Sequence, residues 1–98
     1  MAVYAVVYTY AENSTAARDQ HRPAHREYLD ELATQGVNLV SGPFGPDDAP
    51  GALLLFRADS AKEALAYTEP DPFRTEGVVT DVSVREWIPV LGPLTEHF

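Results

Sequence analysis

The sequence contains no cysteine in its 98 residues. This absence excludes disulfide frameworks, thiolate nucleophiles, and zinc or iron–sulfur sites with cysteine ligands. Positive charge is also scarce, since seven Lys and Arg residues stand against fifteen Asp and Glu residues, which gives a formal net charge of −8. The cations are scattered along the chain, with only Arg22 and Arg26 close together. Because so acidic a surface repels a phosphate backbone, we expect no nucleic-acid partner.

Long hydrophobic runs are absent as well. The opening stretch, MAVYAVVYTYAENS, is too short in apolar residues to cross a bilayer and lacks a basic leader. We therefore expect no signal peptide, no membrane partner and a cytoplasmic location. No linker, internal repeat or low-complexity stretch divides the sequence, so we expect one domain over residues 1–98. With 45% hydrophobic residues, the chain has enough apolar material for a core.

Four segments have the composition of β-strands. The first combines β-branched and aromatic residues, and both of its alternating faces are apolar. A loop rich in Pro and Gly, residues 41–51, separates the second strand from the third. The last contains Pro89, which is tolerable mainly at a sheet edge. The predicted strands are residues 2–10, 37–40, 52–56 and 82–91.

Two segments predict helices. Pro23 suits the first position of a long helix and Gly36 suits its far end, after a polar loop or short turn over residues 11–20. Ser60 and Glu63 form a capping box for a second helix, which must end ahead of Pro70. One apolar stripe of the first helix, at positions i, i+3, i+4 and i+7, consists of His25, Tyr28, Leu29 and Leu32.

The order of these elements is βαββαβ, which predicts a ferredoxin-like α+β fold. In this arrangement a four-stranded antiparallel sheet has its first and third strands in the centre and two helices on one face. The first strand is apolar on both faces, so something must cover the other face of the sheet. A second copy packed sheet to sheet, giving a dimeric α+β barrel, is the economical solution because isologous dimers are the commonest oligomers.

His25 is the first candidate for chemistry. In the opening turn of the predicted helix and on its apolar stripe, the imidazole experiences burial and the positive end of the helix dipole, which both oppose protonation. A neutral imidazole at neutral pH is what a general base requires. The alternative is that a single histidine on such a stripe is a core or capping residue.

Asp71 is the second candidate. It lies between Pro70 and Pro72, which restrict the backbone around its carboxylate. A fixed carboxylate beside an imidazole selects the tautomer and stabilises the imidazolium that forms when the ring takes a proton. The alternative is that Asp71 only forms a turn after the second helix.

Three motifs, taken together, resemble the YciI-like (YCII-related) family. They are Arg22-Pro-Ala-His25, Ser41-Gly-Pro-Phe44, and Asp71-Pro-Phe73 followed by Gly77-Val78, in the family order over nearly the whole chain. The resemblance implies a ferredoxin-like fold, a dimeric or higher assembly, and an active site that pairs His25 with Asp71. Many relatives carry Ala before the Asp-Pro pair where this chain has Pro70, a difference that bears on the orientation of Asp71.

Two functions remain open. The first is a small cofactor-independent enzyme, in which His25 takes a proton from an acidic C–H or phenolic O–H and Asp71 stabilises the imidazolium. Elimination, isomerisation, and lactone or quinol chemistry on a small aromatic or anionic substrate all fit this scheme. The second is a non-catalytic dimeric domain that binds a small ligand or serves as an accessory, with His25 and Asp71 in a structural hydrogen bond.

The remaining expectations concern the cavity around this pair. Arg22 is expected to hold an anionic group of the substrate. No metal site is expected, because Asp47 and Asp48 point in divergent directions on a loop and no further ligand completes a shell. The other residues expected to bind the substrate are Ser41, Gly42, Pro43, Phe44 and Phe73.

Overall fold

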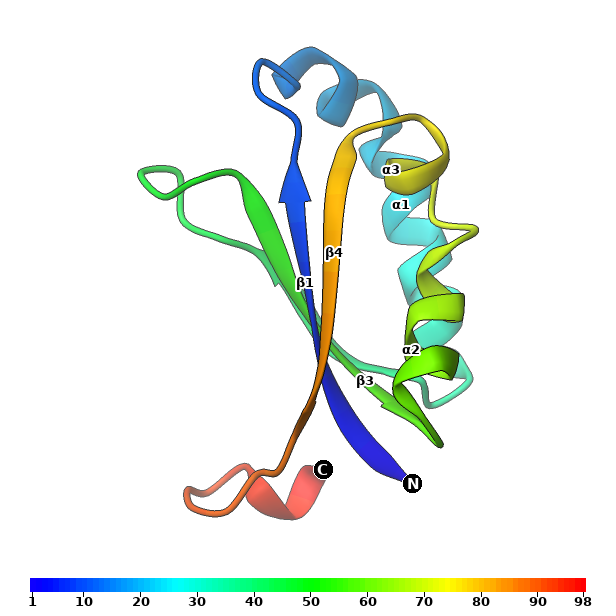
Figure 1. Ribbon diagram of the computed structural model, residues 1–98, viewed down its shortest axis with the longest axis vertical. Coiled ribbons are helices and arrows are strands. Elements are labelled where there is room, and N and C mark those ends of the chain that lie inside the picture. Colours follow the sequence, from blue (N-terminus) through cyan, green and yellow to red (C-terminus); the bar gives the residue numbers. More distant parts are fainter.

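Four antiparallel strands form one sheet, and every helix of substantial length lies on the same face of it (Figure 1). The computed structural model describes all residues, 1–98. The strand order β2-β3-β1-β4 puts β1 and β3 in the centre, which confirms the predicted ferredoxin-like α+β fold. The strands are β1 (Ala2–Tyr10), β2 (Asn38–Pro43), β3 (Gly51–Ala58) and β4 (Val79–Trp87). The helices are α1 (Thr15–Thr34), α2 (Ala61–Thr68), α3 (Pro72–Thr75) and the 3-10 turn η1 (Thr95–His97).

The long helix α1 begins earlier than predicted. It starts at Thr15 rather than at Pro23, and Pro23 lies inside it. Arg18 already makes a helical hydrogen bond to the Ser14 carbonyl, at 2.8 Å. Pro23 has no amide hydrogen to donate, and Figure 1 shows the first turns of α1 bent away from the axis of the rest. The far end agrees with the prediction, since Gly36 has φ +79°.

Both edge strands differ from the predicted boundaries. Residues 41–43, expected in a loop, extend β2, where Ser41 pairs with Leu54. Because β2 has a free edge, Pro43 is tolerated there. At the other edge, β4 starts at Val79 and ends at Trp87, so Pro89 lies beyond the strand rather than within it.

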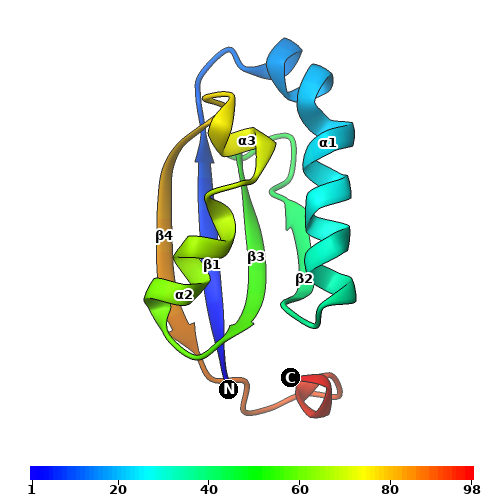
Figure 2. The ribbon, with the colours of Figure 1, turned by 90° about the vertical axis from the view of Figure 1, so that its right-hand side faces the viewer.

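The core lies between the helices and the sheet. Val6 and Tyr8 of β1 face the helices and are fully buried. Against them pack Leu29 and Leu32 of the predicted apolar stripe of α1. Figure 2 shows α1 alongside the β2 edge and α2 in front of β1 and β4.

The caps of α2 follow the prediction made from sequence. The Ser60 hydroxyl accepts the Glu63 amide at 3.0 Å, and the Glu63 carboxylate accepts the Asp59 amide at 3.2 Å. The helix ends at Thr68 with Glu69 as its C-cap. An additional short helix, α3, follows the Pro70 break and was not predicted. None of the helices has the length and apolar character needed to span a bilayer.

The opposite face of the sheet carries no α-helix, and the C-terminal segment with η1 lies on that side, at one end (Figure 1), where Phe98 packs against Trp87 with ring centroids 5.4 Å apart. Because side chains alternate along a strand, Val3 and Leu55 point to this face, away from the core. Leu53 and Trp87 on the same face are about 40% exposed, at 38% and 41% respectively. Beyond β4 the chain continues with exposed apolar residues, namely Ile88, Val90, Leu91 and Leu94.

Candidate active site

His25 and Asp71 are in contact on the helix side of the sheet. The distance from His25 Nδ1 to Asp71 Oδ1 is 2.7 Å, although 46 residues separate them in sequence. The Asp71 side chain is fully buried and the His25 side chain is 10% exposed. The two predicted catalytic residues therefore form one hydrogen-bonded pair at the junction of α1 and α3.

Asp71 is held by three donors. It is the N-cap of α3, where its Oδ1 accepts the Phe73 amide at 3.0 Å, and Pro72 occupies the first turn. Its Oδ2 accepts the Tyr8 hydroxyl from β1 at 2.8 Å. With His25 as the third partner, the carboxylate joins one strand and two helices. Asp71 therefore does take part in the turn after α2, as the alternative expected, but its side chain also contacts His25 and Tyr8.

His25 lies near the middle of α1, not in its opening turn. The argument from the helix dipole is therefore wrong, because the dipole acts only within the first and last turns. Burial and packing define its surroundings instead. The imidazole stacks on the Phe73 ring, with centroids 3.8 Å apart and planes 2° apart, so Phe73 fixes the ring from one side.

The hydrogen bonds indicate which nitrogen of His25 is free. An ionised Asp71 only accepts hydrogen bonds, so Nδ1 carries the hydrogen in this pair. Nε2 has no partner within the protein. Asn38 Oδ1 is the one side-chain nitrogen or oxygen that is both inaccessible to solvent and without a hydrogen-bond partner. Because His25 Nε2 also lacks a partner, it must be accessible to solvent. A neutral His25 therefore presents an open lone pair at Nε2.

The charge of Asp71 acts on the tyrosines around it. Burial raises the pKa of Tyr8 well above its ordinary value, and the negative charge of Asp71 adds to this shift. The same two causes, in the same order, raise the pKa of Tyr10 and of Tyr28. All three phenols are therefore neutral at physiological pH, and Tyr8 serves Asp71 as a hydrogen-bond donor.

A cavity of about 740 Å³ lies beside the pair, between α1, β2 and the loop after β2. His25 is in its wall, whereas Asp71 is behind His25 and does not reach the surface of the cavity. Apolar parts of the wall come from Leu54 and Leu29. All residues predicted to bind the substrate line it, namely Arg22, Ser41, Gly42, Pro43, Phe44 and Phe73.

Sequence reasoning missed two groups at this site. The first is Tyr8, the second donor to Asp71, whose position on the helix-facing side of β1 follows from strand alternation. The second consists of Arg18 and Arg26, which line the cavity together with Arg22. The interpretation of the cations as scattered is therefore wrong, because a helix that starts at Thr15 brings all three to the same cavity wall.

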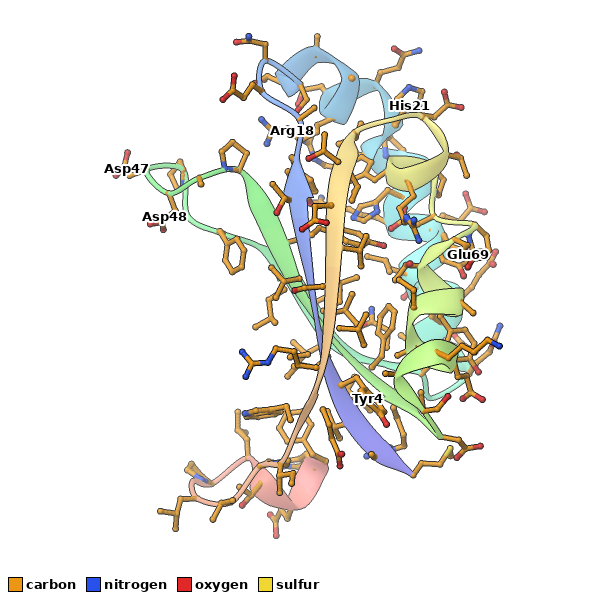
Figure 3. The ribbon with its side chains drawn as sticks, viewed as in Figure 1. Tyr4, Arg18, His21, Asp47, Asp48 and Glu69 are labelled. Carbon is orange, nitrogen blue, oxygen red and sulfur yellow. The ribbon has the colours of Figure 1, made fainter.

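No three Asp, Glu or His side chains come together in a way that could hold a metal ion. Asp47 and Asp48 lie at the tip of the loop between β2 and β3 and point out of the molecule (Figure 3). Arg18, by contrast, lies where α1 begins, close to the end of β1 (Figure 3).

Comparisons with known proteins agree on the fold. Over 87% of this chain and 92% of the other, the structure is similar, with a TM-score of 0.73 and 27% sequence identity, to 5-chloro-2-hydroxyhydroquinone dehydrochlorinase from Burkholderia phenoliruptrix AC1100 in complex with 2,5-dihydroxybenzoquinone. A putative antibiotic biosynthesis monooxygenase from Nitrosomonas europaea shares the fold at 16% identity, with a TM-score of 0.60 over 93% of this chain and all of that one.

None of the curated protein sequences matches this chain. The family described as the YCII-related domain matches residues 2–88, nearly the whole length. The fold and this match together support the resemblance read from the three motifs. The chain belongs to the YCII-related domain family.

Proposed function

We propose that this protein is a small enzyme that needs no cofactor and uses His25 as a general base. The observation that carries the proposal is the geometry of the pair: Asp71 occupies Nδ1 at 2.7 Å, Nε2 has no partner within the protein, and the His25 side chain lines the cavity. A base must be within reach of a substrate proton and must be unprotonated before the reaction. His25 meets both conditions when its ring is neutral.

The role of Asp71 follows from its surroundings. When Nε2 takes a proton, the imidazolium gains a charge-assisted hydrogen bond to the buried carboxylate, which lowers the free energy of the charged intermediate. Tyr8 and the Phe73 amide hold the carboxylate in place throughout. Asp71 is thus a positioning residue that acts through His25, since it does not touch the cavity.

The substrate class follows from the cavity and from the similar dehydrochlorinase. Phe73, Leu54 and Phe44 offer apolar surface for a small ring beside the imidazole. The similar dehydrochlorinase acts on a chlorinated hydroxyhydroquinone, which supports phenols and quinols as the substrate class. In an elimination, Nε2 takes a proton from the substrate and the electrons freed expel the leaving group. In an isomerisation, the same proton returns to a different atom.

Substitution of His25 tests the proposal. Chloride release from 5-chloro-2-hydroxyhydroquinone and proton exchange of quinols and lactones are measured for the wild type and for His25→Asn. We expect the substitution to lower the rate by about 100-fold or more. His21→Asn is the matched control, because His21 lies on the same helix but outside the cavity wall.

The alternative function gives a different result in this experiment. A non-catalytic binding domain would bind 2,5-dihydroxybenzoquinone, detected by nuclear magnetic resonance titration, without turnover of any substrate in the panel. A His25→Asn variant that turns over substrate at the rate of His21→Asn would also contradict the proposed base.

We also propose that two copies pair through the open face of the sheet. Leu53 and Trp87 leave apolar surface exposed on this face, and the exposed apolar residues after β4 continue it. An isologous pair covers the same face of both copies at once. The expected mass in solution is twice the 10.8 kDa of one chain.

Light scattering during gel filtration measures this mass. Leu53→Lys, on the open face, should give a monomer. Leu65→Lys is the matched control, because Leu65 is exposed to the same degree, 37% against 38%, but lies on α2. A wild-type monomer at micromolar concentration, or an unchanged dimer in Leu53→Lys, would contradict the proposed interface.

A further inference from the structure

The cavity wall carries a charge opposite to that of the whole protein. The chain has a net charge of −8 and only seven Lys and Arg residues. Three of these seven, Arg18, Arg22 and Arg26, line the cavity. Asp30 is the one acidic residue in the cavity wall. Positive charge focused in a concave site raises the local concentration of anions. The rest of the acidic surface repels them, so the cavity is the place where an anion is attracted.

The guanidinium groups keep donors free for a ligand. Arg26 makes no hydrogen bond and no ion pair within the protein. Arg22 is paired with Asp19 at 2.8 Å on the exposed side of the helix. Arg18 donates to Ser14 Oγ at 3.1 Å, and its guanidinium lies 5.3 Å from the centre of the Tyr10 ring. Of the three, only Arg22 has a carboxylate partner, so most of their positive charge is not neutralised within the protein.

The wall opposite the arginines is apolar. Leu54 and Ala52 of β3 form an apolar floor, and Phe73, stacked on His25, also lines the cavity. A ligand that matches both walls has an apolar body and an anionic end. Guanidinium groups bind carboxylates by parallel, charge-assisted hydrogen bonds.

We propose that the ligand of this cavity is a small ring compound bearing a carboxylate, bound at its anionic end by Arg18, Arg22 and Arg26. This inference rests on the proposed function only in taking the cavity beside His25 as the ligand site. It adds the charge of the ligand and the residues that select for it. The arginines orient the ring so that its reactive side faces Nε2 of His25.

A pair of probes that differ only in charge tests the proposal. The dissociation constants of 2,5-dihydroxybenzoate and of its neutral amide, 2,5-dihydroxybenzamide, are measured by nuclear magnetic resonance titration of the full chain. We expect the carboxylate to bind roughly tenfold more tightly at low salt. Raising the ionic strength should weaken binding of the carboxylate and leave binding of the amide unchanged, because salt screens the interaction of the arginines only with a charged ligand.

Two pairs of variants locate the effect. Arg26→Gln should weaken binding of the carboxylate roughly fivefold to tenfold. Lys62→Gln removes the same charge from an exposed position on α2 and should leave the affinity for the carboxylate unchanged. Asp30→Asn should strengthen carboxylate binding roughly twofold to fivefold, because it removes the opposing charge from the wall. Asp59→Asn is the control for that gain, since Asp59 is exposed and outside the cavity.

The results separate this inference from the proposed enzyme. Equal affinities of the two probes, no binding of either probe, or equal effects of Arg26→Gln and Lys62→Gln would overturn the anionic ligand. Those outcomes leave the test of His25 by turnover unaffected. Conversely, charge selection that persists in His25→Asn, together with no turnover in the wild type, upholds the anionic ligand and refutes the enzyme.

Discussion

The hydroxyl of Tyr8 provides a direct test of the buried network. Tyr8→Phe removes one oxygen and leaves the ring in the core, where Tyr8 is fully buried. Asp71 Oδ2 then loses its donor, and no water reaches it because Asp71 is also fully buried. A hydrogen bond to an ionised group contributes about 1.5–3 kcal/mol, so we expect the free energy of unfolding to fall by about 2 kcal/mol. For a domain of this size, that corresponds to a fall in Tm of about 8–16 °C.

Urea unfolding at pH 7, followed by circular dichroism, measures the change. The matched control is Tyr10→Phe, because Tyr10 lies on the same face of β1, is 6% exposed and makes no hydrogen bond through its hydroxyl within the protein. We expect that control to change stability by less than about 0.5 kcal/mol. All proteins are compared at one concentration, since association would make stability depend on concentration.

A double-mutant cycle with Asp71→Asn then isolates the pair. The Tyr8→Phe change should cost much less in the Asp71→Asn background, where the acceptor is no longer ionised, with a coupling free energy of about 1 kcal/mol or more. Equal effects of Tyr8→Phe and Tyr10→Phe, or strictly additive effects in the cycle, would refute a buried ionised carboxylate held by Tyr8. Without that carboxylate, the stabilisation proposed for the His25 imidazolium would fail too.

Further predictions concern pH, packing and capping. Burial and then Asp71 raise the pKa of Tyr8 above 10.0, so the folded protein keeps a proton that the unfolded chain releases above that pH. The stabilisation is therefore complete below about pH 10, and at higher pH the free energy of unfolding declines by about 1.4 kcal/mol per pH unit. Urea titrations should show a smaller decline for Tyr8→Phe than for the wild type; identical slopes for the two proteins would contradict this prediction. Gly51→Ala should cost about 1–3 kcal/mol, because its methyl group would collide with the Tyr8 carbonyl oxygen; an unchanged urea midpoint would disprove that close approach. Ser60→Ala should cost about 1 kcal/mol through the lost cap of α2, and an effect no larger than that of the exposed Ser83→Ala would argue against the cap.

Local sequence signals predicted the architecture but not all of its boundaries. The two apolar faces of residues 2–10 mark a central strand, and Ser60 and Gly36 mark a helix start and a helix end. The start of α1 was misplaced because Pro23 fits a first helical position, and local preference cannot reveal that the residues before it are helical as well. Boundaries of β4 depend on its partner, since Val3 near the start of β1 pairs with Trp87.

The candidate site shows a related limit. The separation of His25 and Asp71 by 46 residues is not readable from spacing, and the family resemblance was what paired them. Tyr8 was missed because its partner depends on where α3 begins, a short helix with little signal of its own. Arg18 was missed because a helix starting at Pro23 leaves it in the preceding loop or short turn, so that its place beside Arg22 and Arg26 is not evident.

The bend at Pro23 divides α1 into two parts with separate tasks. The turns before it carry Arg18 and Arg22, whereas the turns after it carry His25, Arg26 and the core residue Leu29. Pro23 cannot donate to the Asp19 carbonyl, so one backbone hydrogen bond between the two parts is missing. Arg18 and Arg22 make no hydrogen bond to His25, so substitutions at these two positions are expected to leave the His25–Asp71 pair in place. If the arginines select the ligand as proposed, the part of that selectivity carried by Arg18 and Arg22 can change separately from His25, whereas the part carried by Arg26 is tied to the turn that holds the imidazole.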